Sequence, residues 1–186
     1  MSRPTLTFIA GANGSGKTTL TRWNSEEFNE IPVLDPDAIA NILQAGTSTL
    51  RPIAAGREVL KSAAEHLDRA ESFAIETTLS GKNYLQMMLD ARKRGFEIVL
   101  VYIGTENVEI NLARIRNRVL AGGHDVPEDD VRRRYKRSLE NLPIAVKRVD
   151  HVILFDNSTE NGYQLVGILG ATGDRWFEQK PTWLAL

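Results

Sequence analysis

The chain has 186 residues, no cysteine, and 23 basic and 24 acidic side chains that nearly cancel. This length is typical of one domain, which buries enough surface to fold without a disulfide or a structural metal. The absence of cysteine excludes disulfides, thiol nucleophiles and zinc–thiolate sites. The balanced charge argues against nucleic acid as a partner.

Five short apolar runs, rich in Val, Ile and Phe, alternate with longer segments of helical spacing. The runs are residues Leu6–Ala10, Ile31–Leu34, Phe73–Thr77, Ile98–Ile103 and His151–Phe155. This alternation predicts an α/β fold with a parallel sheet covered on both faces, and ligands beyond the carboxyl ends of the strands. No run approaches the ~18–20 residues of a membrane span. We therefore expect a single cytoplasmic domain over residues 1–186 with no membrane association.

The segment after the first apolar run matches the Walker A pattern G-x-x-x-x-G-K-[ST] in full. Its residues are Gly11, Ala12, Asn13, Gly14, Ser15, Gly16, Lys17 and Thr18, and Thr19 follows in the first helical turn. The glycines allow backbone N–H groups to surround a phosphate at a helix N-terminus. Lys17 is expected to bridge the β- and γ-phosphates, and the Thr18 hydroxyl to bind Mg²⁺. The pattern therefore predicts binding of ATP and Mg²⁺.

Two carboxylates follow the second run, Asp35 and Asp37. We expect Asp35 to orient Mg²⁺ and Asp37 to accept the proton of an acceptor hydroxyl, because phosphoryl transfer needs positioning and charge stabilisation. The alternative is a turn in which either aspartate caps the next helix.

The third run ends in Glu76, followed by Thr77 and Thr78. A single acidic residue here differs from the Asp-Glu pair of P-loop hydrolases, whose second carboxylate activates water. This difference favours transfer to a bound acceptor. The alternative is a polar strand end without ligand contact.

Residues 114–148 carry ten basic and five acidic side chains. Arg114 and Arg118 lie one helical turn apart, and Gly122-Gly123 separates them from a second helix that bears Arg134 and Arg137. Arginine binds phosphate oxygens in pairs and keeps its charge. We therefore expect a lid over approximately residues 114–140 that closes on the triphosphate. The alternative is a solvated helix face.

These motifs, in this order, resemble the zeta toxin family and its short chromosomal members, from Gly11 to about Leu142. The resemblance implies a three-layer P-loop fold with a five-stranded parallel sheet of order 2-3-1-4-5 and a small helical lid. It also implies an ATP-dependent kinase of UDP-N-acetylglucosamine. Asp37 matches the general base, Glu76 and Thr78 match substrate-pocket positions, and Glu58 or its neighbour Arg57 matches a substrate-contacting position. His124 stands where the larger toxins carry an arginine, and Arg134 or Arg137 could supply the second.

The chain is shorter than the plasmid-borne toxins, whose extra length helps to build the sugar-nucleotide pocket. The resemblance also implies a small helical antitoxin as a partner. Two rival functions stay open: a kinase of another small metabolite, and an ATP-binding regulatory switch that phosphorylates nothing. The tail from Gly162 is glycine-rich and contains Trp176, Phe177 and Trp183. We expect it to pack against the sheet.

Overall fold

The computed structural model describes residues 3–23, 31–36, 39 and 51–186. Asp37 therefore lies outside the described residues. The elements, in chain order, are β1 (Thr5–Ala10), α1 (Lys17–Trp23), β2 (Val33–Leu34), α4 (Arg51–Arg69), β3 (Phe73–Thr77), α5 (Lys82–Lys93), β4 (Glu97–Gly104), α6 (Val108–Leu120), α7 (Glu128–Val146), β5 (His151–Asp156), β6 (Gln164–Gly170) and β7 (Arg175–Trp176).

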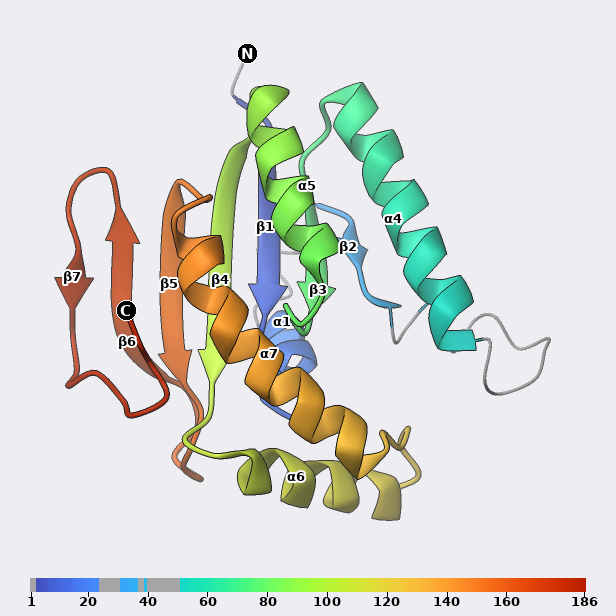
Figure 1. Cartoon of the computed structure of the whole chain (residues 1–186), viewed down its shortest axis with the longest axis vertical. Helices are drawn as coiled ribbons and strands as arrows, with labels where there is room; N and C mark the ends of the chain where they lie inside the picture. Colours follow the sequence, from blue (N-terminus) through green and yellow to red (C-terminus); the bar gives the residue numbers. More distant parts are fainter. Residues whose placement is uncertain (1–2, 24–30, 37–38, 40–50) are drawn as a thin grey trace.

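One sheet of seven strands organises the molecule, in the order β2-β3-β1-β4-β5-β6-β7 (Figure 1). The first five strands are parallel in the predicted order 2-3-1-4-5, so the predicted core of the fold is confirmed. The second strand is shorter than expected, since only Val33 and Leu34 pair with β3. The carboxyl ends of the parallel strands lie together at the lower edge in Figure 1, next to α6 and the start of α1.

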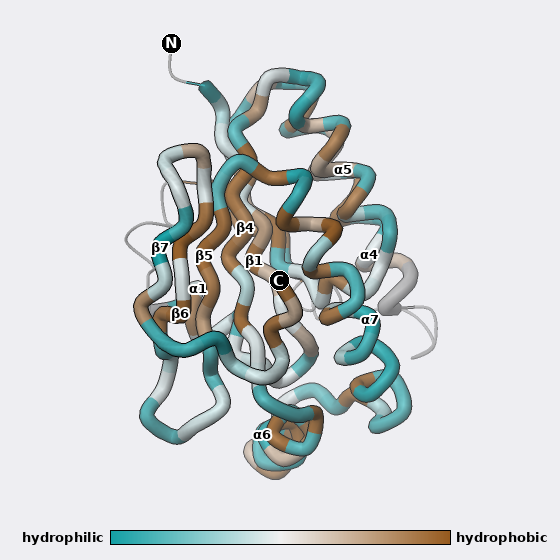
Figure 2. The backbone as a smooth tube through the Cα atoms, turned by 60° about the vertical axis from the view of Figure 1, so that its left-hand side comes forward, coloured by the Kyte–Doolittle hydropathy of each residue, from teal (hydrophilic) through white to brown (hydrophobic). Residues whose placement is uncertain are grey.

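Helices α4, α5 and α7 cover one face of the sheet, and α1 lies on the other (Figure 1). The central strands are apolar along most of their length (Figure 2), as expected for strands buried on both faces. Alternate residues of β1, β3 and β4, such as Phe8, Ile75 and Leu100, are fully buried in the main core. Among the described helices, none is long and apolar enough to span a bilayer.

The tail departs from the expectation of five strands, because it extends the sheet as well as packing on it. Strand β6 pairs antiparallel with β5, and β7 pairs antiparallel with β6. The expected packing does occur at Trp183, which is buried and lies against Tyr102, with ring centroids 5.7 Å apart. Gly104 allows this approach, since a Cβ there would lie 2.3 Å from the indole.

The predicted lid is a helical hairpin of α6 and α7 joined by residues 121–127. Its tip has a small core of its own, formed by Leu112, Ile115, Val126 and Val131. Helix α7 continues beyond the expected end near residue 140, and its second half joins the main core through Leu142 and Ala145. The hairpin is thus a tip anchored to the sheet by one long helix.

Candidate active site at the carboxyl ends of the strands

The phosphate loop connects β1 to α1 with three glycines in a conformation that L side chains rarely adopt. The φ angles of Gly11, Gly14 and Gly16 are 146°, 77° and 108°. A Cβ at Gly11 would lie 2.3 Å from Ile103 O, and one at Gly14 would lie 2.6 Å from Asn111 O. Both the dihedral angles and the close approach of the backbone therefore require glycine here.

Two polar groups of this loop, the Lys17 ammonium and the Ser15 hydroxyl, indicate which kind of ligand it could bind. The Lys17 ammonium donates to Gly11 O at 2.8 Å and to Ala12 O at 3.1 Å, so it lies across the loop. The buried hydroxyl of Ser15 has no hydrogen-bond partner among the described residues. A buried polar atom without a partner is costly unless a ligand satisfies it. A loop of turned backbone N–H groups with a lysine at its mouth fits a polyphosphate.

Glu76, at the end of β3, is directed at the first turns of α1. Its two carboxylate oxygens accept from Thr18 Oγ1 and Thr21 Oγ1, each at 2.9 Å. Burial raises the pKa of Glu76, the nearby Asp35 carboxylate raises it further, and Lys17 and the two threonines oppose the rise. Two carboxylates and the Thr18 hydroxyl are thus gathered beside the lysine, and oxygen ligands of this kind suit Mg²⁺.

The chain beyond Glu76 makes a strained turn. Leu79 is fully buried with a φ of 56°, in the left-handed region that non-glycine residues seldom adopt. Its carbonyl oxygen accepts from Asn141 of α7 at 2.8 Å. The turn brings Thr78 Oγ1 and Ser80 Oγ within 2.8 Å of each other. Strain of this kind persists where the surroundings hold it, often at binding sites.

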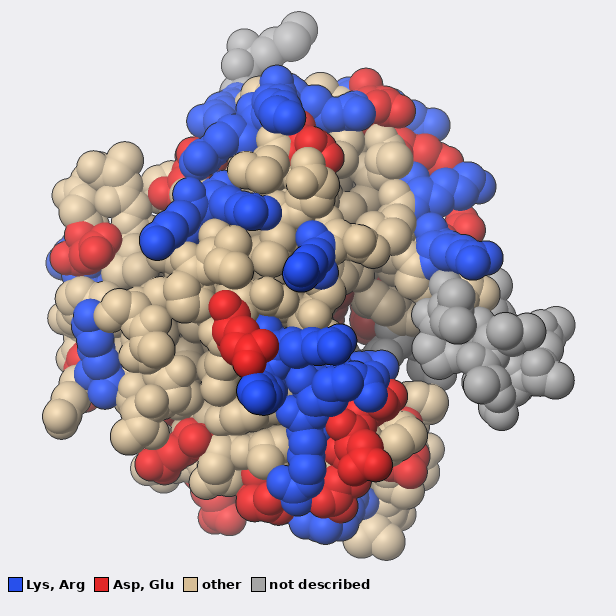
Figure 3. All heavy atoms as spheres, viewed as in Figure 1, with Lys and Arg blue, Asp and Glu red and all other residues tan. Residues whose placement is uncertain are grey.

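The hairpin brings part of the predicted arginine set to the phosphate loop. Arg134 Nη1 donates to Asn13 Oδ1 at 3.3 Å, and Arg114 on α6 has a buried Nη1 without a hydrogen-bond partner in the described part of the chain. Arg118, Arg137 and His124 are exposed. Lys and Arg side chains gather over the position of α7 (Figure 3). The structure thus places Arg134 at the loop and leaves Arg137 and His124 towards solvent.

Two further predicted residues, Arg57 and Glu58, are not gathered here by any recorded contact, whereas Thr19 adjoins the phosphate loop. Arg57 and Glu58 are exposed on α4, and Glu58 lies 4.0 Å from Lys61. Thr19 is exposed in the first turn of α1, where its N–H donates to Gly16 O at 3.0 Å. The nucleotide side of the predicted site is therefore assembled more fully than the acceptor side.

Five residues of this region were missed by the sequence interpretation. Thr21 holds Glu76, Asn141 holds the Leu79 turn, and three side chains bind carbonyl oxygens of the phosphate loop: Asn111, Asn157 and Tyr163. Thr21 lies four residues after Lys17 on the helix and could have been found from that spacing. The other four carry no local signal, since their partners are distant in the sequence.

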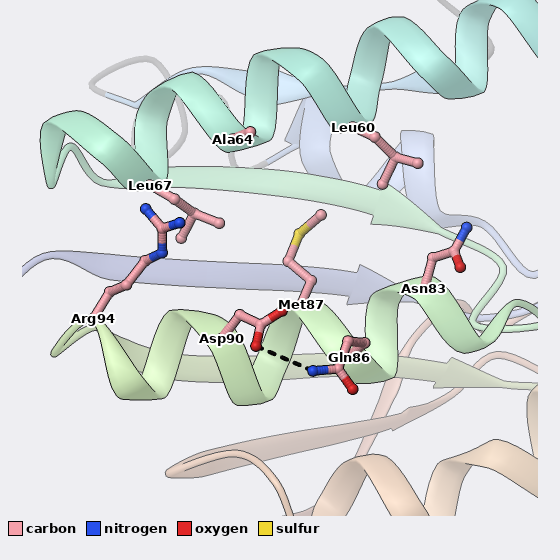
Figure 4. A pocket seen from close by; sticks show the side chains of 8 residues that line it. All are labelled: Leu60, Ala64, Leu67, Asn83, Gln86, Met87, Asp90 and Arg94. Atoms are coloured by element: carbon pink, nitrogen blue, oxygen red, sulfur yellow. Dashed lines mark hydrogen bonds between the residues drawn. The ribbon is translucent and has the colours of Figure 1, made fainter.

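A hollow of about 310 Å³ lies elsewhere, between α4 and α5 (Figure 4). Leu60, Leu67 and Met87 give it an apolar wall, and Gln86 donates to Asp90 at its rim. None of the predicted site residues lines it. It is therefore separate from the candidate site.

The profile of the zeta toxin family matches residues 1–164. A protein of Haemophilus influenzae described as uncharacterized is 41% identical over 128 residues, which cover 69% of this chain and 90% of that protein.

Solved structures show the same fold at low sequence identity. A chain of the AvrRxo1-ORF1:AvrRxo1-ORF2 complex superposes with a TM-score of 0.76 at 16% identity, over 94% of this chain and 61% of that chain. A chain from the PezAT chromosomal toxin–antitoxin system of Streptococcus pneumoniae gives 0.64 at 18% identity, over 88% and 71%. Shikimate kinase from Acinetobacter baumannii gives 0.50 at 21% identity, over 86% of each chain.

This chain thus spans about 61% of the AvrRxo1 complex chain that it matches. Its fold is that of the P-loop kinases, with the sheet order predicted from the sequence. With the match over residues 1–164, this protein belongs to the zeta toxin family.

Proposed function

We propose that the protein is an ATP-dependent kinase that phosphorylates a hydroxyl group of a small molecule, with UDP-N-acetylglucosamine as the acceptor. The carrying observation is the Glu76 carboxylate held against Thr18 at the phosphate loop, beside Asp35 and Lys17. Such an arrangement supports phosphoryl transfer, in which positioning and charge stabilisation supply most of the catalysis. Family membership supports the same reaction class.

The nucleotide side is built from the phosphate loop and α6. The N–H groups of the loop and the Lys17 ammonium bind the β- and γ-phosphates, and the unpartnered atoms of Ser15 and Arg114 gain ligand oxygens as partners. A structure of the AvrRxo1-ORF1:ORF2 complex with ATP, which has a TM-score of 0.74 at 16% identity, supports ATP as the ligand of this fold.

The metal side consists of Thr18, Asp35 and Glu76. These residues would hold Mg²⁺, which would supply positive charge against the phosphate oxygens. Thr18 would hold the metal through its hydroxyl, and Asp35 and Glu76 would orient that hydroxyl or water around the metal. Both oxygens of Glu76 are used on α1, so its contacts favour this role over the substrate contact that the resemblance implies.

The acceptor side is proposed from Asp37, Thr78 and the residues that the family resemblance adds, Arg57, Glu58 and His124. The acceptor oxygen attacks the γ-phosphorus, the bond from that phosphorus to the β–γ bridging oxygen breaks, and ADP leaves. The acceptor proton passes to the Asp37 carboxylate. Arg134 and Arg137 of α7 stabilise charge on the transferred group, with Arg134 nearer the loop.

A partner is also proposed. PezAT is a toxin–antitoxin system, and the AvrRxo1 chain was solved in a complex of two proteins. We propose a small helical antitoxin for this chain, in the cytoplasm. Co-expression with a neighbouring small gene product, followed by co-purification, tests this partner independently of the reaction.

The test of the function is incubation of the protein with Mg²⁺, γ-³²P-ATP and single acceptors, followed by chromatography of the products. The acceptors are UDP-N-acetylglucosamine, other sugar nucleotides, free sugars and nucleosides, and Lys17→Ala is the inactive control. We expect label on UDP-N-acetylglucosamine. Label on another acceptor overturns the substrate and keeps the kinase. Binding of ATP without labelled product from any acceptor supports the regulatory switch instead.

A further inference from the structure

The phosphate loop is held from outside by three side chains that are distant in the sequence. Each side chain donates to a different carbonyl oxygen of the loop. Asn111 Nδ2 binds Asn13 O at 2.7 Å, Asn157 Nδ2 binds Ser15 O at 2.8 Å, and Tyr163 Oη binds Gly16 O at 2.7 Å. We call these donors the three clamping side chains. Asn111 lies on α6, Asn157 directly follows β5, and Tyr163 directly precedes β6.

The direction of these bonds sets the direction of the loop N–H groups. In a planar trans peptide, the carbonyl oxygen and the next N–H point to opposite sides. When the carbonyls of Asn13 and Ser15 are tied outward, the N–H groups of Gly14 and Gly16 turn inward. Neither of these N–H groups has a hydrogen-bond acceptor among the described residues. The clamping therefore presents donors to the inside of the loop, where phosphate oxygens bind.

The clamping side chains are themselves fixed. Asn111 is fully buried, and its Oδ1 accepts from Thr105 Oγ1 at the end of β4. Asn157 is 7% exposed, and its own N–H donates to Gly104 O at 2.9 Å. The ring of Tyr163 packs edge-on against a neighbouring aromatic ring of β5. The position of the loop is thus fixed relative to the ends of β4 and β5.

The loop lies so close to these groups that only glycine fits. A Cβ at Gly16 would lie 2.6 Å from Asn157 Nδ2 and 2.7 Å from Tyr163 Oη. A Cβ at Gly14 would lie 2.6 Å from the Asn111 carbonyl oxygen. Two glycines of the motif therefore serve the contact with the clamping side chains as well as the turn itself.

We propose that Asn111, Asn157 and Tyr163 are positioning residues that preorganise the phosphate loop for the polyphosphate of the nucleotide. They act through the loop backbone and touch no part of the base or ribose in this role. Preorganised donors bind charge without the cost of ordering them at the moment of binding. This inference rests on the proposed binding of ATP at the loop.

The variants are chosen to remove side-chain hydrogen bonds to the loop. Asn157→Leu removes the bond to Ser15 O. Tyr163→Phe removes the hydroxyl, which binds Gly16 O and also lies against Thr19 and the Leu20 backbone of α1, while Gly16 O keeps its bonds from the N–H groups of α1. Asn141→Leu is the matched control for the first, since it removes a 2.8 Å bond to Leu79 O. Tyr102→Phe is the control for the second, since it removes a buried bond to Ser138 Oγ.

The measurement is calorimetric binding of ATP and of inorganic tripolyphosphate, each with Mg²⁺, with the thermal stability of every variant recorded. One net hydrogen bond corresponds to about three- to ten-fold in affinity. We expect Asn157→Leu to weaken both ligands about ten-fold and Tyr163→Phe about three-fold. The two controls lose stability but keep the affinity for tripolyphosphate.

The outcomes separate this inference from the proposed function. If wild type binds both ligands and Asn157→Leu and Tyr163→Phe bind them equally well, only this inference is overturned. A loss for ATP without a loss for tripolyphosphate also overturns it, because it would place these side chains on the nucleoside. If wild type binds neither ligand, the proposed function and this inference both fall. Tyr163→Phe keeps the test open if Asn157→Leu fails to fold.

Discussion

The two ends of the parallel sheet differ in whether their polar groups have hydrogen-bond partners. At the amino ends, the Asp150 carboxylate accepts from the Ile98 N–H at 2.8 Å and from Arg92 Nη2 at 3.0 Å. Arg3 binds the carbonyls of Gly95 and Phe96 at 2.7 and 2.6 Å. Burial raises the pKa of Asp150, but the Ile98 amide and Arg92 outweigh it, so this pKa lies below its ordinary value.

At the carboxyl ends, buried groups are left without partners. Ser15 Oγ and Arg114 Nη1 are buried without hydrogen-bond partners among the described residues. Burial and Asp35 raise the pKa of Glu76. The same sheet thus pairs its charged groups at the amino ends and leaves buried polar groups unpaired at the carboxyl ends. This contrast is common in enzymes, because active-site residues are often less favourable for the stability of the fold than other residues would be at the same positions.

The largest expected effect separates two arginines of the carboxyl end. We expect Arg134→Ala to slow phosphoryl transfer by about 10³-fold, because it lies at the phosphate loop and an arginine on the transferring group can contribute this much. Arg137→Ala should have a smaller effect, since Arg137 is exposed. The single-turnover rate and the ATP affinity are measured for both variants.

For both variants the loss of rate should exceed the loss of ATP affinity, as for charges used mainly in the transition state. Arg134→Lys serves as the control that keeps the charge but not the planar fork. Equal losses of rate and affinity would place the arginine on the ground-state triphosphate. No loss at Arg134 would contradict its placement in the site.

A smaller effect is expected at the amino end, on stability alone. Asp150→Asn should lower the free energy of unfolding by about 1–2 kcal/mol at pH 7, because it weakens charge-assisted hydrogen bonds to Ile98 and Arg92. The pKa of Asp150 is lowered on folding, so its stabilisation is present above the unfolded pKa and is lost as pH falls through the folded value. The difference from wild type should therefore shrink below about pH 4.

Urea unfolding at several pH values measures this difference, and ATP binding is measured in parallel. If the amino ends contribute only to stability, Asp150→Asn keeps the ATP affinity of wild type. A variant with the stability of wild type but weakened ATP binding would contradict this division of roles between the two ends.

The smallest effect is expected at Glu76 and has the opposite sign. The pKa of Glu76 is raised on folding, so wild type loses stability as pH rises from the unfolded pKa through the folded value. Glu76→Gln removes this loss and should be more stable than wild type by up to about 1 kcal/mol at pH 7, with no advantage below about pH 4. Its Mg²⁺-dependent ATP binding should weaken. A Gln variant less stable than wild type at pH 7 would contradict the idea that this carboxylate is held at a cost.

The sequence predicted the parts of the molecule whose signals are local. The strand Phe73–Thr77 was predicted with its observed bounds. The Walker A residues form one continuous loop, and its glycines have the positive φ angles that favour glycine. The sheet order came with the family resemblance and is confirmed. Local patterns suffice where neighbouring residues determine the conformation.

The rest depends on contacts between distant segments. Asn111, Asn157 and Tyr163 bind loop carbonyls 98, 142 and 147 residues away, and single polar residues give no periodic signal. The sequence predicts only packing for the tail, because glycines within Gln164–Gly170 weaken the strand pattern; in the structure Gly167 and Gly170 make room for Trp176 and His151. Asp37, expected as the general base, lies outside the described residues, so its role stays a prediction.

The most direct test of the proposed kinase is a paired measurement on wild type and Asp37→Asn. Phosphorylated acceptor and free phosphate are quantified together, with and without UDP-N-acetylglucosamine. Asparagine keeps the size of the side chain but cannot take a proton, a role worth about 10²–10⁴ in rate. We expect the variant to bind ATP and Mg²⁺ like wild type, to lose phosphorylation of the acceptor to this extent, and to keep the slow hydrolysis of ATP. An Asp37→Asn variant that phosphorylates every working acceptor at the wild-type rate would contradict the mechanism and leave Asp37 as a helix cap.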